Sequence, residues 1–139
     1  MTISSRSNPL IKELRALSMA KVRRETGTHF IEGEKLVEEA LRSGMQIETL
    51  LTEEGYDRFA EAPCRRRETV TRDVMESVCE AKTPQHVCVA VVTEDRPMPE
   101  RFPEGLLVLL DRVQDAGNVG TIIRSSDAFG AAGVLLTEG

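Results

Sequence analysis

A twelve-residue segment, Glu94–Gly105, divides this 139-residue chain into two parts of unequal length. It contains three prolines and six charged residues. Proline lacks a backbone N–H and charged side chains resist burial, so the segment can continue neither a helix nor a buried strand. The sequence therefore predicts a linker over 94–105, which joins a domain over 1–93 to the start of a second domain over 106–139.

The helices expected before the linker have apolar residues at helical spacing. The first follows Asn8 and Pro9, residue types typical of an N-cap and a first helical position, and ends at Gly27. Further helices are expected over EKLVEEALRSG, over the short run YDRFAEA and over RDVMESVCEA. The inward positions expected on the first two helices are Leu10, Leu14, Leu17 and Val22, and Leu36, Val37, Ala40 and Leu41.

Apolar runs between these helices predict strands. They are THFIEG, QIETLLTE, a brief run at ETV, and HVCVAVVTE, which has four valines in nine residues. Strands that alternate with helices favour an α/β sandwich.

The region after the linker reads as a parallel β-α-β unit. LLVLLD is a continuous apolar strand of the type that is buried on both faces, and AGVLLTEG begins another. The helix between them, VGTIIRSSDAFG, is expected to turn Val119, Ile122, Ile123 and Phe129 inward. A unit of about 34 residues leaves bare sheet edges and unpacked faces. We therefore expect either that Gly139 is not the natural end or that a partner completes the sheet.

Composition excludes several classes of protein. No apolar run approaches the roughly 18 to 20 residues that span a bilayer, and the N-terminus lacks the core of a signal peptide, so we expect a cytoplasmic protein. Cys64, Cys79 and Cys88 are odd in number and widely spaced, which favours reduced thiols over a disulfide set or a zinc site. His29 and His86 are too few and too isolated to indicate a metal cluster.

Charge is distributed unevenly along the chain. Residues 1–24 contain six basic residues and one acidic residue, a local charge of +5, which leaves −10 on the rest of a chain whose net charge is −5. This asymmetry indicates a polyanionic partner, although a solvated helix face would have the same pattern.

The stretch DRVQDAGNVGTIIRSSDAFGAAG contains the strongest functional signal. Its glycines form neither G-x-G-x-x-G nor a P-loop, so a nucleotide-phosphate cradle is disfavoured. Gly117 and Gly120 would let the backbone pass close to a ligand, and a helix that starts near Asn118 would offer N–H groups to an anion. Arg124 flanks the apolar helix face, where its guanidinium could clamp a phosphate.

A structural role for this arginine is the alternative. Arg124 could instead form an ion pair with Asp127 or Asp115.

This stretch resembles the first signature motif of the SpoU (TrmH) family of RNA ribose 2'-O-methyltransferases, in the knotted SPOUT superfamily. The matching residues are Asp111, Val113, Gln114, Asp115, Gly117, Asn118, Gly120, Ile123, Arg124, Asp127, Ala128, Phe129 and Gly130. ISSRSNPLIKELRAL, FIEGEKLVEEAL and TPQHVCVAVV resemble the family's substrate-binding domain, a small three-layer α/β/α fold akin to RNA-binding ribosomal proteins. Ala116 stands where the motif commonly has proline, and His86 where glycine usually follows TPQ.

The resemblance implies transfer of a methyl group from S-adenosylmethionine to a ribose 2'-hydroxyl, in 23S ribosomal RNA or in transfer RNA. It implies a homodimer when full length, with no metal and no membrane partner. The second and third motifs, which form the knot and hold the cofactor, would lie beyond Gly139, so we expect the 139-residue chain alone to be inactive. Arg124 matches the catalytic arginine, and Asn118 would orient either that side chain or the substrate.

The resemblance also gives the basic N-terminal segment a role. We expect Arg6, Lys12, Arg15, Arg23 and Arg24 to contact RNA phosphates, with Arg65, Arg66 and Arg67 as an alternative surface. Two other functions stay open, a non-catalytic RNA-binding module and a small-molecule-binding α/β protein without RNA affinity.

Overall fold

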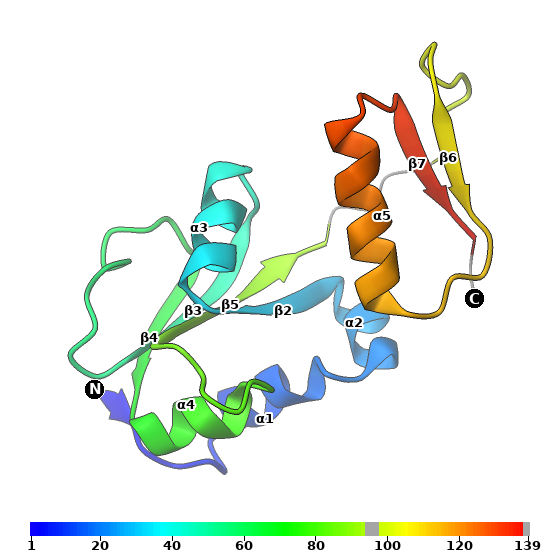
Figure 1. The fold of residues 1–139 in the computed structure, drawn as a ribbon. Helices are drawn as coiled ribbons and strands as arrows, with labels where there is room; N and C mark the ends of the chain where they lie inside the picture. Colours follow the sequence, from blue (N-terminus) through cyan, green and yellow to red (C-terminus); the bar gives the residue numbers. More distant parts are fainter. Residues whose placement is uncertain (94–97, 138–139) are drawn as a thin grey trace. The chain divides into compact units, whose positions relative to one another are not determined.

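The structure is a computed structural model that describes residues 1–93 and 98–137 (Figure 1). It divides into two compact units, Met1–Asp95 and Arg96–Gly139, and each has its own sheet. Of the predicted linker, residues 94–97 lie outside the described residues, and residues 98–105 form neither helix nor strand.

The first unit has a mixed five-stranded sheet in the order β1-β4-β3-β5-β2. Its strands are β1 (Thr2–Ile3), β2 (Thr28–Glu32), β3 (Ile47–Glu53), β4 (Arg66–Val70) and β5 (Val87–Val92). β1, β4 and β3 are parallel, whereas β5 is antiparallel to both β3 and β2. The predicted strands are confirmed, and β1 is an addition at the edge.

Two of the helix predictions for this unit are wrong. The single helix expected up to Gly27 is two helices, α1 (Pro9–Ala16) and α2 (Ala20–Thr26). The Arg23 guanidinium donates hydrogen bonds of 2.8 and 2.7 Å to the carbonyls of Leu17 and Ser18, which satisfies backbone acceptors at the break. The predicted ends are confirmed, because Asn8 caps the Leu10 N–H and Gly27 adopts a left-handed φ of 62°.

YDRFAEA forms turns instead of the predicted short helix. Arg67 donates hydrogen bonds of 2.6 Å to the carbonyls of Phe59 and Ala62, so a side chain from β4 occupies acceptors in this segment. The other two predicted helices form as α3 (Glu34–Arg42) and α4 (Arg72–Val78).

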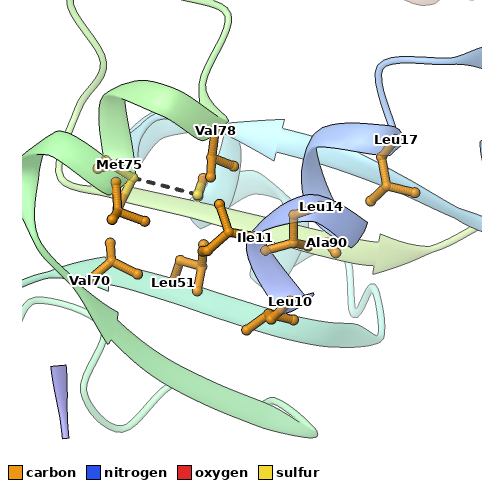
Figure 2. Packing of buried hydrophobic residues seen from close by; sticks show 11 residues of the cluster. Leu10, Ile11, Leu14, Leu17, Leu51, Val70, Met75, Val78 and Ala90 are labelled. Atoms are coloured by element: carbon orange, nitrogen blue, oxygen red, sulfur yellow. Dashed lines mark hydrogen bonds between the residues drawn. The ribbon is translucent and has the colours of Figure 1, made fainter. Parts of the chain in front are cut away.

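Helices cover both faces of the sheet, so the predicted three-layer α/β/α arrangement is confirmed (Figure 1). Side chains of α1 and α4 pack on one face of β3, β4 and β5, as Figure 2 shows for Ile11, Met75 and Leu51. On the opposite face, Val37 and Ala40 of α3 pack in a second buried cluster. Leu36, expected in the α3 stripe, is 58% exposed, because the helix turns Val37 and Ala40 to the sheet.

The second unit is the predicted parallel β-α-β. It contains β6 (Leu107–Leu110), α5 (Ala116–Ala128) and β7 (Gly133–Leu136), and β6 pairs with β7 from Leu107↔Gly133 to Leu110↔Leu136.

The burial expected for this unit is partly wrong. Leu110 is buried, but Leu109 is 62% exposed, Ile123 of α5 is 42% exposed and Phe129, which follows α5, is 86% exposed. Ser126 is the buried residue of α5. Within residues 98–137, two strands and one helix cannot cover both faces of the strands. Neither described stretch of the chain has a helix of the length and apolarity needed to cross a membrane.

Candidate functional site

Hydrogen bonds link the segments that follow the carboxyl ends of β6 and β7. The Arg112 backbone N–H donates to Thr137 Oγ1 at 2.9 Å, and this hydroxyl lies 3.1 Å from Asp111 Oδ1. Arg112 has a φ of 52°, an uncommon left-handed conformation for a residue other than glycine. The chain therefore turns sharply at the sheet edge where α/β folds place their ligands, and then enters α5.

The first turn of α5 is capped by a carboxylate. Asp115 is the N-cap, and its Oδ1 accepts the Asn118 backbone N–H at 2.7 Å. A Cβ on Gly117 would lie 3.1 Å from the same oxygen, which favours glycine there. The helix therefore begins at Ala116, earlier than predicted, and the capping carboxylate makes its N-terminus less suited to an anion than we expected.

Ala116 and Gly120 occupy less demanding positions. Ala116 is the first helical residue, where proline is favoured because its missing N–H costs no hydrogen bond. Alanine at this position leaves the helix start intact. A Cβ on Gly120 would meet no atom within 4 Å, so the structure gives no evidence of the close backbone approach that we expected there.

Arg124 lies on α5 with its side chain exposed. In residues 1–93 and 98–137 it forms no ion pair with Asp115 or Asp127, the two partners of the structural alternative. Asn118 is also exposed. Six residues of helix separate the two by about 9 Å along the axis and about 120° around it, and no hydrogen bond between them is found in the described part of the chain.

The five basic residues predicted to contact RNA have different local environments. Arg6 forms a bidentate ion pair with Asp73, with 2.7 Å between Nε and Oδ2, and these hydrogen bonds raise the pKa of Arg6 and lower that of Asp73. Arg23 is half-buried at the α1–α2 break. Lys12, Arg15 and Arg24 are exposed and have no ion-pair partner among the described residues.

The arginines of the alternative basic surface, Arg65, Arg66 and Arg67, all have hydrogen-bond or ion-pair partners within the first unit. Arg65 and Arg66 form ion pairs of 2.8 and 3.0 Å with Glu48 and Glu68. Arg67 is held by the two backbone carbonyls described above. These contacts leave fewer guanidinium donors for a polyanion than Lys12, Arg15 and Arg24 offer.

A cleft of about 580 Å³ opens beside the α1–α2 break, a feature that the sequence did not predict. Its apolar lining includes the buried Leu14 and Leu17 and the half-buried Phe30. Its polar lining includes Arg15, Ser18, Arg23, His29, Glu32 and Glu80. Burial and the charge of Arg23 lower the pKa of His29, which favours its neutral form.

Comparison with known families matches both units. The profile of the MRM3-like substrate binding domain matches residues 8–89, and that of the SpoU rRNA Methylase family matches residues 105–139. The first match alone covers more than half of the chain. This chain belongs to the SpoU family of RNA methyltransferases.

Curated relatives of the SpoU-family chain extend well beyond it. It is 37% identical to the 23S rRNA (guanosine(2553)-2'-O)-methyltransferase RlmP of Bacillus subtilis, over 99% of this chain and 54% of the relative. An uncharacterized tRNA/rRNA methyltransferase of Synechocystis is 33% identical, over 98% and 52% of the two chains. The SpoU-family chain therefore spans about half the length of the curated relatives it matches.

Solved structures agree with this assignment. An AdoMet-bound rRNA methyltransferase from Sinorhizobium meliloti superposes with a TM-score of 0.84 at 33% identity, covering 100% of the SpoU-family chain and 55% of the other chain. The SpoU methyltransferase AviRb from Streptomyces viridochromogenes, in complex with AdoMet, gives 0.80 at 25% identity, with 93% and 52% covered. The predicted α/β fold class is therefore confirmed.

Proposed function

We propose that this chain is the substrate-binding domain and the start of the catalytic domain of an S-adenosylmethionine-dependent RNA 2'-O-ribose methyltransferase that acts on ribosomal RNA. The observation that carries the proposal is the exposed Arg124, presented on the helix that follows the carboxyl edge of β6. Similarity to the 23S rRNA methyltransferase RlmP of Bacillus subtilis supports ribosomal over transfer RNA as the substrate.

The reaction needs a ribose hydroxyl placed in line with a methyl donor. S-adenosylmethionine, which AviRb binds, supplies a methyl group on a positively charged sulfur. We assign no residue of this chain to the cofactor. The chain's own task is to hold the RNA in attack geometry, because positioning removes much of the entropic barrier to a two-substrate reaction.

Arg124 clamps the phosphate next to the reacting ribose. A guanidinium presents a planar fork of donors that matches two phosphate oxygens, and it stays protonated in nearly all proteins. Its positive charge would make the 2'-hydroxyl more acidic. The hydroxyl would give its proton to water and accept the methyl group from S-adenosylmethionine, whose carbon–sulfur bond breaks to release S-adenosylhomocysteine. A role as general base would require a neutral guanidinium and is disfavoured. Asn118 orients the substrate, since no hydrogen bond joins it to Arg124 in the described part of the chain.

A methyl-transfer assay tests this proposal. The complete product of the gene that encodes this chain is incubated with total RNA and S-adenosylmethionine labelled in its methyl group. Arg124→Lys keeps the charge but loses the planar fork, so we expect turnover to fall by more than about tenfold, with a modest loss of RNA affinity. Arg101→Lys, at another exposed arginine, is the control. Wild-type turnover in Arg124→Lys would contradict the assigned role.

The N-terminal unit supplies phosphate contacts through Arg6, Lys12, Arg15, Arg23 and Arg24. Neutralising Lys12, Arg15 and Arg24 with glutamine should lower the slope of log affinity against log salt by about one unit per contact. Lys21→Gln, which removes an exposed α2 lysine that pairs with Glu25, is the control. An unchanged slope in the triple variant would place the RNA on another surface.

A non-catalytic RNA-binding module is the second candidate, and the match of residues 8–89 to a substrate binding domain favours it. It predicts that the 139-residue chain binds RNA with an affinity that depends on salt. It also predicts that neither this chain nor the complete gene product transfers a methyl group. For the enzyme we propose a homodimer in the cytoplasm, where ribosomal RNA is available. Methyl transfer by the gene product would exclude the module.

A further inference from the structure

The cleft beside the α1–α2 break combines an aromatic surface with charged groups. A volume of about 580 Å³ lies within the roughly 300–1,000 Å³ of sites that hold small ligands. Phe30 lines it from β2, and Leu14 and Leu17 line it from α1 and the turn that follows. These apolar groups suit a flat ring more than a phosphate or a metal ion.

A basic hollow adjoins the cleft. It has a volume of about 340 Å³ and is lined by Lys12, Arg15, Ala16 and Ser18. Arg15 and Ser18 line both spaces, so the cleft and the hollow are neighbours beside α1. Lys12 and Arg15 are exposed and have no ion-pair partner within the described residues, which leaves their charges available to an anion.

Glu32 gives the cleft hydrogen-bond acceptors. Its two carboxylate oxygens accept the backbone N–H groups of Glu80 and Ala81, at 2.9 and 3.0 Å, so the side chain is held in place. Each oxygen keeps a second lone pair. Two adjacent acceptors match the two adjacent N–H donors on the Watson–Crick edge of guanine, whereas adenine and uracil each present one.

We propose that this cleft binds one unstacked base of the RNA substrate, guanine in preference, while the adjoining phosphate lies over Lys12 and Arg15. The base stacks on Phe30, because aromatic side chains bind splayed-out bases of single-stranded RNA. The inference rests on the proposed function and adds a base-reading site in the N-terminal unit, separate from the residues assigned to methyl transfer. A neutral apolar molecule would leave Lys12, Arg15 and Glu32 without a role.

The test measures binding of the 139-residue chain to a fluorescein-labelled ten-nucleotide oligouridylate with one central position varied. We expect central guanosine to bind about tenfold more tightly than a central abasic residue, with adenosine in between. Phe30→Leu removes the ring but keeps apolar volume, and Ser18→Leu narrows the entrance from an exposed position. Either variant should reduce the guanosine preference to below about twofold, and Phe30→Leu should leave the abasic affinity unchanged.

Matched controls separate the cleft from the rest of the chain. Phe102→Leu changes a partly exposed phenylalanine in the other unit, and Ser43→Leu adds a leucine after α3; both should keep the preference. Salt-dependent binding without any guanosine preference, or a preference that survives both cleft variants, would overturn the base site and leave the proposed function standing. Absence of both RNA binding and methyl transfer by the complete gene product would instead reject the proposed function. If Ser18→Leu changes the oligomeric state in solution and keeps the guanosine preference, the occupant of the cleft is a second copy of the chain and the inference is overturned.

Discussion

At the scale of single residues, Glu53 joins two basic side chains outside the candidate site. It accepts hydrogen bonds from His86 Nδ1 at 2.9 Å and from Arg72 Nη1 at 3.1 Å. Burial alone would raise the pKa of Glu53, but these hydrogen bonds and the two neighbouring charges lower it below its usual value. His86, which replaces the glycine common after TPQ, therefore has a structural partner.

Glu53→Gln should lower the thermal stability of the first unit at pH 7 by several degrees. A carboxylate with a lowered folded pKa stabilises the fold above its unfolded pKa of about 4.3, and this contribution is lost as the pH falls through the folded value. The difference between wild type and variant should therefore shrink between pH 7 and pH 3. Thermal unfolding followed by circular dichroism measures it, with the exposed Glu39→Gln as control. A difference that is independent of pH would contradict the role of the ionised carboxylate.

Residue contacts were predictable only where they are local. Asn8 and its cap on Leu10 follow from two residue types next to each other. Arg124 and Asn118 were found through a contiguous motif. The pairing of Arg6 with Asp73 joins residues 67 positions apart, and no periodicity indicates which acid an exposed arginine meets.

At the scale of elements, α1 is held to the sheet by a few fully buried side chains. Ile11 has no exposed surface and packs with α4 and the strands in the cluster of Figure 2. Helix–sheet contacts of this kind, more than helix propensity, stabilise a helix of eight residues.

Ile11→Ala should lower the free energy of unfolding by about 2–5 kcal/mol, because it removes apolar contacts and leaves a cavity that the strands cannot fill. Leu36→Ala, at a side chain 58% exposed on α3, should change it by less than about 0.5 kcal/mol. Urea unfolding of the two variants gives both values. Equal losses would show that the packing in this structure does not determine the stability of α1.

Predictions of helices failed where a side chain from another element donates hydrogen bonds to the backbone. The apolar spacing of Leu14, Leu17 and Val22 continues across the α1–α2 break, so the pattern alone favours one helix. Arg23 caps the break from the following helix, and Arg67 of β4 does the same for the turns over 57–62. Leu17, Ser18 and Arg23 at the first of these breaks line the cleft beside α1, so a pattern that favours one helix does not predict the cleft.

At the scale of the whole chain, the two units differ in how completely they bury their strands. The first has helices on both faces of five strands, and β3 and β5 at its centre are almost entirely buried. The second has two strands and one helix, with Leu110 as its buried strand residue and large apolar side chains exposed. The sequence predicted the β-α-β order correctly, but burial on both faces of LLVLLD requires neighbours that residues 98–137 do not supply.

Hydrogen exchange of the 139-residue chain should therefore be uneven. Amides of β3 and β5 should exchange only through global unfolding of the first unit, whereas those of β6 and β7 should exchange at least about a hundredfold faster through local opening. The physical reason is that a two-stranded sheet with one covered face gains little free energy from burial, so its hydrogen bonds open more often. Mass spectrometry of peptic peptides resolves the four strands in one experiment. Equal protection of all four strands in the 139-residue chain would mean that the second unit is stable without further cover.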